Sequence, residues 1–199
     1  MTQVPLLEEN AAVEAARGHW QYTGGQRPEF AHSPGPGQES VWDFPRPPRC
    51  EAVAELVEVR AQGVVIAQTN RAQRVLETAG APTYYIPPED VDLTRIRFGA
   101  RSSVCEWKGR AQVLDVMGGH GEAGETGDAE KLIVGAGWRY VEMFKAFAHL
   151  YQWCAFYPAL VDCFLGDQPV TAQPGGYYGG WVTPSLAGPI KGGPNSSAW

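Results

Sequence analysis

Glycine and proline interrupt this chain at short intervals, which leaves little room for long helices. The 199 residues include 24 glycines and 16 prolines, and both residue types form turns or end regular elements. Hydrophobic residues make up 44% of the sequence and aromatic residues 11%, enough for a folded core. Short strands joined by tight turns, with large rings between the sheets, accommodate this pattern. We therefore expect a mainly β protein of antiparallel strands.

Two segments carry the clearest signature of paired strands. Residues 54–60 and 64–69 are rich in alternating apolar residues and flank Gln62-Gly63, a favourable hairpin turn. Residues 104–108 and 111–116 form a second expected pair around Gly109. Further strands are expected at residues 74–77, 83–86, 131–138, 153–157 and 161–165.

One principal helix is expected at residues 140–151. Met143, Phe144, Phe147 and Leu150 are three or four residues apart, which places them on one helical face. A shorter helix is expected within residues 6–17, where Ala, Glu and Leu favour helix.

The composition divides the chain into an arm and a domain. Residues 1–39 read as an N-terminal extension, because they become polar and rich in Gly and Pro towards residues 33–37. Residues 40–199 read as a single domain that includes a Gly-rich and aromatic tail from Pro174 onwards. The rings of that tail are costly to leave in water, so we expect the tail to pack along the domain or a partner.

Charge and hydropathy exclude several classes of partner. The net charge is −6 and no dense patch of Lys and Arg is present, so nucleic acid is not an expected partner. No apolar run approaches the roughly 20 residues that span a bilayer, and no signal peptide is recognisable, so no membrane association is expected. The expected partner is a small-molecule ligand, and a homo-oligomer is left open.

The four cysteines favour reduced thiols over disulfides or a metal site. Cys50, Cys105, Cys154 and Cys163 are widely separated and form no Cys-x-x-Cys pair. We therefore expect a cytoplasmic protein without a metal or another cofactor. The loop at residues 118–128 carries His120 and three acidic residues, but its Gly-rich spacing fixes no ligand geometry.

The densest group of reactive side chains lies in residues 103–109 (SVCEWKG). In a strand, Cys105 and Trp107 share one face, while Glu106 and Lys108 share the other. Cys105 is a candidate nucleophile and Lys108 a candidate catalytic cation or amine. A face that bears Trp is more often buried, so we expect Cys105 to react slowly with alkylating reagents.

Several aromatic residues in strand-like segments could face a common cavity. Trp107, Trp138, Tyr85 and Tyr157 would supply its walls. Glu106, Lys108 or Arg71 would orient a ligand there. The alternative is that the same rings fill the core of a small β sandwich.

Six segments together resemble the family known as domain of unknown function 427. These segments are residues 40–48 (SVWDFPRPP), 72–78 (AQRVLET), 83–91 (TYYIPPEDV), 105–109 (CEWKG), 155–158 (AFYP) and 175–181 (GGYYGGW). The resemblance covers about residues 40–199 and implies an antiparallel domain similar to the β-tent fold, in which two sheets meet at an angle. Zinc-holding β-tent proteins use two paired-cysteine turns, which this sequence lacks.

Three functions are compatible with these features. The leading hypothesis is a β-tent-like module that binds a small organic molecule in an aromatic cleft around Trp107. The second is an enzyme that uses the same cleft, with Cys105 or Lys108 as the catalytic group. The third is an interaction module that docks through its aromatic tail.

Overall fold

The computed structural model describes residues 3–120 and 130–199 and is mainly β. Strands make up 41% of it and helices 12%. Its strands form several sheets, and all strand pairs in the described residues are antiparallel except the short parallel pair of β1 with β15. The expected fold class is therefore confirmed.

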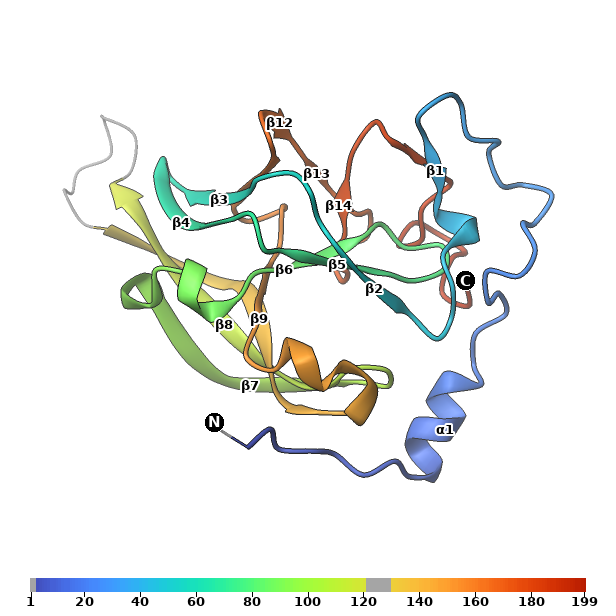
Figure 1. Cartoon of the computed structure of the whole chain (residues 1–199), viewed down its shortest axis with the longest axis horizontal. Helices are drawn as coiled ribbons and strands as arrows, with labels where there is room; N and C mark the ends of the chain where they lie inside the picture. Colours follow the sequence, from blue (N-terminus) through green and yellow to red (C-terminus); the bar gives the residue numbers. More distant parts are fainter. Residues whose placement is uncertain (1–2, 121–129) are drawn as a thin grey trace.

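The longest strands form one four-stranded sheet, which lies in the lower half of Figure 1. Its order is β10-β9-β8-β7, with β7 at Ile96–Cys105, β8 at Gly109–His120, β9 at Glu130–Met143 and β10 at Cys154–Phe156. The expected hairpin around Gly109 is present, but its turn is at residues 106–108 and its strands extend further than expected.

A second four-stranded sheet lies above the first (Figure 1). Its order is β12-β11-β3-β4, with β3 at Val57–Ala61, β4 at Val64–Thr69, β11 at Asp162–Leu165 and β12 at Gln168–Pro169. The hairpin between β3 and β4 turns at Gln62 and Gly63, both at positive φ (50° and 78°), as the sequence predicts.

A three-stranded sheet connects to the first sheet. It contains β2 at Arg49–Ala52, β5 at Gln73–Leu76 and β6 at Thr83–Tyr85, in the order β2-β5-β6. Just beyond β6, Ile86 and Cys154 exchange two backbone hydrogen bonds of 2.8 Å, which link this sheet to β10. The strand segments that form the candidate site are thereby fixed relative to one another.

The remaining elements are short. They are α1 at Ala11–Arg17, β1 at Glu39–Ser40, β13 at Thr171–Ala172, β14 at Trp181–Val182, β15 at Leu186–Ala187, and four 3-10 helices, η1 at Val41–Asp43, η2 at Pro88–Asp90, η3 at Leu93–Arg95 and η4 at Lys145–Leu150. No helix in the described ranges is long and apolar enough to cross a bilayer.

The main core lies between the two four-stranded sheets. Val57 and Val59 of β3 pack there with Leu114 and Val116 of β8 and with Phe156 of β10. Because side chains alternate along a strand, the other face of β8 is turned away from this core. That other face carries the candidate site.

The prediction of a principal helix at residues 140–151 is wrong. Residues 140–143 are the end of β9, where Glu142 pairs with Arg110 and Met143 with Gly109 of β8. Only Lys145–Leu150 is helical, as the 3-10 helix η4. The apolar spacing reflects burial rather than helix, because Met143, Phe147 and Leu150 all enter one hydrophobic cluster. The α-helix that the described residues contain is α1.

Both ends of the chain pack against the sheets. Near the N-terminus, Leu7 donates a backbone hydrogen bond of 2.8 Å to Met143, and α1 lies beside the turn between β7 and β8 (Figure 1). Near the C-terminus, Trp199 packs at 5.2 Å on Trp42. The tail therefore packs along its own domain. The division into an arm at 1–39 and a domain at 40–199 stays a prediction.

The expected loop at residues 118–128 starts later in the structure. β8 continues to His120, and residues 121–129 lie outside the described residues. The acidic residues of that loop, Glu122, Glu125 and Asp128, are among them.

Substitution of Gly109 by Ala should destabilise the fold more than the same change at Gly63. Both glycines have positive φ, 131° and 78°, which costs a residue with a Cβ about 1–3 kcal/mol. At Gly109 the new Cβ would also overlap the carbonyl oxygen of Glu142, whereas nothing lies within 4 Å at Gly63. Urea unfolding of both variants measures the difference, and equal losses would contradict the close approach of β8 to β9.

Candidate functional site

A cavity of about 810 Å³ lies on the face of the β7-β8-β9 sheet opposite the main core. Ala111 and Val113 of β8 line it, while Leu114 and Val116 of the same strand belong to the core. Strands supply the rigid part of the wall. The rest comes from the segment after β5, from the tail, and from Trp20 of the N-terminal segment.

Aromatic rings form much of the wall. Trp138 of β9 lies 4.6 Å from Tyr157 and 6.3 Å from Tyr85, measured between ring centroids. These three residues are expected in a common site from the sequence, and the structure brings them together. Gly179 of the tail lies against Trp138 so closely that a Cβ would overlap the indole ring. A glycine is needed there for the tail to approach the wall.

The exposed part of the cavity lining is largely apolar, although Arg101 and Ser103 are also exposed there. Four of the nine exposed large hydrophobic side chains found among the described residues line the cavity, namely Val104, Val134, Leu160 and Tyr177, and we call these four residues the mouth. Exposed apolar groups gathered in one place mark a binding surface more often than scattered ones do.

The floor of the cavity is polar. We use this name for five of the titratable lining residues, Glu77, Tyr85, Cys105, Lys108 and Lys191, none of which is exposed. Glu77 is at its centre, because its carboxylate lies 3.9 Å from Nζ of Lys108 and 3.6 Å from Nζ of Lys191. Arg46 approaches the same carboxylate from behind the floor, at 3.1 Å.

Each of these charges changes the pKa of its neighbours. Burial opposes the ionised form of Glu77, but Lys108, Lys191 and Arg46 outweigh it and hold the pKa of Glu77 below its ordinary value. Burial also opposes the charge on Lys108, yet Cys105, Tyr85 and Glu77 raise its pKa overall. Burial dominates at Lys191 and lowers its pKa, with Arg46 adding repulsion.

The phenol of Tyr85 is the unsatisfied group of the floor. Tyr85 is 0% exposed, and its hydroxyl makes no hydrogen bond of good geometry among the described residues, although the polar groups of Tyr140 and Trp138 lie close enough to interact with it. Burial raises the pKa of Tyr85 to about 12, so the phenol keeps its proton at neutral pH and remains a donor.

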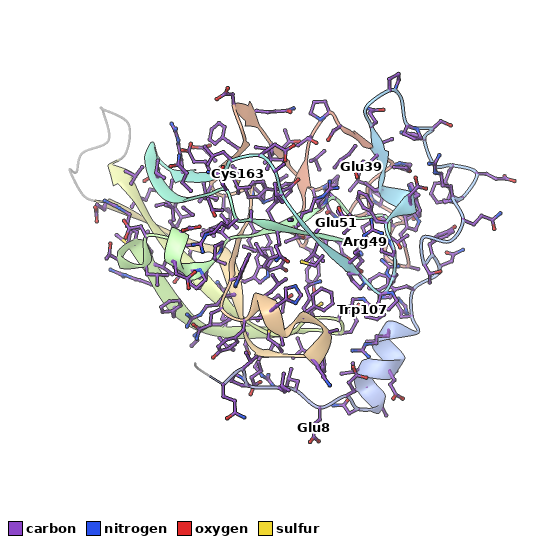
Figure 2. All side chains as sticks on the ribbon, viewed as in Figure 1. Glu8, Glu39, Arg49, Glu51, Trp107 and Cys163 are labelled. Atoms are coloured by element: carbon purple, nitrogen blue, oxygen red, sulfur yellow. The ribbon has the colours of Figure 1, made fainter. Side chains whose placement is uncertain are left out.

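Trp107 does not line the cavity, which differs from the sequence-based expectation. It is 8% exposed and belongs to a hydrophobic cluster, beside α1 in Figure 2, where the guanidinium of Arg17 lies 5.2 Å from its ring. Residues 106–108 form a turn rather than strand, so the alternation of faces stops at Cys105. Trp107 is therefore a packing residue, and Cys105 and Lys108 both reach the cavity.

Arg71 also lies apart from the cavity. Arg71 is in the loop before β5, its side chain is 60% exposed, and it pairs with Asp90 at 2.8 Å. Glu106 does line the cavity, where it accepts a hydrogen bond of 2.9 Å from Nε1 of Trp20.

Glu77, Lys191 and Trp20 belong to the site although no sequence pattern predicts them there. Their places depend on contacts between distant segments: Trp20 lies 86 residues before Glu106, its hydrogen-bond partner. Nε1 of Trp20 donates to Glu106, and its ring lies 4.4 Å from Nζ of Lys191 and 4.3 Å from the guanidinium of Arg46. Buried charge at isolated Lys and Glu positions has no local sequence signature.

Within residues 3–120 and 130–199, no group of three or more His, Cys, Asp or Glu side chains could hold a metal ion. All four cysteines are free thiols there. The groups that the site offers for chemistry are two ammonium groups, the carboxylates of Glu77 and Glu106, several phenols and one thiol.

The protein is thus mainly β and has a cavity with a polar floor beside the sheet that contains its longest strands. The family model described as a domain of unknown function (DUF427) matches residues 49–167, more than half of the chain. The protein belongs to this family. Comparison with curated proteins gives no significant match. Residues 49–167 include Cys105, Lys108 and Trp138, but not Trp20 or Lys191.

Iodoacetamide should label Cys105 first. Cys105 lines the cavity, while burial raises the pKa of Cys50 to about 11, raises that of Cys154 to about 12 and also raises that of Cys163. The thiolate is the reactive form, so these three thiols should react slowly near neutral pH. This reverses the expectation from the sequence.

Peptide mass spectrometry at successive times gives the order of labelling. In urea all four thiols should react at similar rates. Faster labelling of Cys154 or Cys163 in the folded protein would contradict the packing described above.

Proposed function

We propose that the protein binds a small, largely planar organic molecule in this cavity. The volume of about 810 Å³ falls within the range of about 300–1,000 Å³ that is usual for small-molecule sites. Trp138 and Tyr157 offer flat apolar surfaces at the wall, and the floor offers a few convergent polar groups. A cytoplasmic location is part of this proposal, since widely spaced free thiols suit a reducing compartment.

The observation that carries the proposal is the unpartnered hydroxyl of Tyr85. Three buried side-chain polar atoms have no partner in the part of the chain that is described, and they belong to Gln62, Tyr85 and Trp107. Of these residues, Tyr85 is the one that lines the cavity. A buried donor without an acceptor costs about 1–3 kcal/mol, and a ligand acceptor that reached this covered hydroxyl would recover that cost.

A second candidate function is catalysis in the same cavity. Cys105 and Lys108 both line the floor, and the two side chains interact. The raised pKa of Lys108 favours a permanent ammonium, which suits stabilisation of negative charge rather than attack as an amine. In this alternative Cys105 is the nucleophile and Lys108 the electrostatic group.

The tail argues against the third hypothesis, docking on another protein. Trp181 is buried in the main core and Trp199 packs on Trp42 and Phe30. Tyr178 lies 4.5 Å from Nζ of Lys191 at the floor. These rings contact the chain's own fold and cavity, which favours small-molecule binding over docking.

Replacement of Tyr85 by Phe should weaken ligand binding without destabilising the fold. The change removes one hydroxyl that has no partner, so the free energy of unfolding should stay equal or rise. Loss of one hydrogen bond of about 1 kcal/mol corresponds to roughly a fivefold weaker Kd. Saturation-transfer NMR with a panel of monocyclic and bicyclic aromatic compounds measures binding, and urea unfolding measures stability.

Tyr84→Phe is the matched control. Tyr84 is the neighbouring residue in β6, is buried, and packs on Trp181 in the main core, away from the cavity. It should leave binding of the panel unchanged. Equal effects of the two variants on binding, or a loss of stability in Tyr85→Phe alone, would contradict the proposed role of the hydroxyl.

A further inference from the structure

The floor and its surroundings carry more positive than negative charge. Three cations, Arg46, Lys108 and Lys191, lie within 4.0 Å of the Glu77 carboxylate. Glu106 is the second carboxylate of the cavity wall. One positive charge therefore remains uncompensated, in a protein whose overall net charge is −6. Arg101 also lines the cavity but is exposed, where water screens its charge.

The uncompensated charge belongs to the two lysines rather than to Arg46. Arg46 is fully engaged, because it donates to the carbonyl oxygens of Tyr22 and Thr78 as well as to Glu77. Its role is structural. Its guanidinium also stacks at 4.3 Å on the ring of Trp20.

Neither lysine has a comparable set of acceptors. Lys108 and Lys191 are 8% and 3% exposed, and their Nζ atoms lie 3.9 and 3.6 Å from Glu77, longer than hydrogen bonds. The other close neighbours of Lys191 are the rings of Trp20 and Tyr178. Lys108 also interacts with the side chain of Cys105. Each ammonium has three hydrogens to donate, so both lysines keep unused donors, and a buried donor without an acceptor is costly.

We propose that the ligand is a monoanion, a carboxylate attached to a planar aromatic body, and that its carboxylate binds beside Lys108 and Lys191. This rests on the proposed function, since it assigns a chemical class to the ligand of the same cavity. The carboxylate accepts hydrogens from the two ammonium groups. The aromatic body lies against Trp138 and Tyr157.

The charge balance favours one negative charge over two. A single carboxylate neutralises the one positive charge that remains. A phosphate monoester would bring a second negative charge close to Glu77 and Glu106, and the described floor offers no cation to compensate for it.

Two matched probes test this inference on the wild-type protein. 2-Naphthoate and 2-naphthamide have the same aromatic body and nearly the same shape, but only the first carries a charge. Calorimetric titration should show naphthoate binding at least about tenfold more tightly than naphthamide. This comparison needs no variant, so it does not depend on whether an altered protein folds.

Lys191→Met, with Lys145→Met as control, localises the effect. Lys145 is an exposed lysine at the start of η4 and lies outside the cavity lining. Lys191→Met should weaken naphthoate binding about tenfold and leave naphthamide binding unchanged, whereas Lys145→Met should change neither. Equal loss of both probes in Lys191→Met would overturn the role of its charge.

The remaining outcomes separate this inference from the proposed function. Naphthamide binding as tightly as naphthoate would overturn the anionic ligand and leave small-molecule binding in place. Tighter binding of 2-naphthyl phosphate than of naphthoate would contradict the inference that the ligand carries a single negative charge. Failure of all three probes to bind would overturn the proposed function and this inference together.

Discussion

The ion cluster around Glu77 is the interaction on which the candidate site depends. One carboxylate, directly after β5, meets three cations from separate parts of the chain: Arg46 before β2, Lys108 in the turn between β7 and β8, and Lys191 near the C-terminus. Each contact ties a different segment to the same point. Buried ion pairs contribute little net stability when intact, but removing one partner is costly because the remaining charges stay buried. Glu77 therefore joins the end of β5, the turn between β7 and β8 and the tail at one point of the cavity.

The cavity combines the matched family region with segments on both sides of it. Residues 49–167 match the family model and supply Tyr85, Cys105, Lys108 and the aromatic wall. Trp20 comes from before that region, and Lys191 from after it. Trp20 links the two, since it donates to Glu106 and covers the ammonium of Lys191. The strands thus provide a rigid wall, and the flanking segments supply part of its charge and its closure.

Local sequence patterns predicted the features that depend on interactions between residues close in the sequence. The strand at residues 64–69 and the turn at Gln62-Gly63 follow from alternation and turn chemistry, and the structure contains both. The structure also brings Tyr85, Trp138 and Tyr157 together, while their contact with a ligand stays a prediction. The prediction of a helix at residues 140–151 was wrong because the pairing of β9 with β8 overrides the helical spacing of the apolar residues. Trp107 was misplaced because a turn breaks the alternation of faces, and Lys191 was missed because its surroundings come from distant segments.

Unfolding of Glu77→Gln is the most direct test of this account. The substitution keeps the shape of the side chain but leaves Arg46, Lys108 and Lys191 without their shared carboxylate. We expect the free energy of unfolding to fall by about 3 kcal/mol or more. Glu142→Gln is the control, because Glu142 pairs with Arg110 at the surface, where such a pair contributes about 0–1 kcal/mol. Equal, small losses in urea unfolding of the two variants would contradict the central role of Glu77.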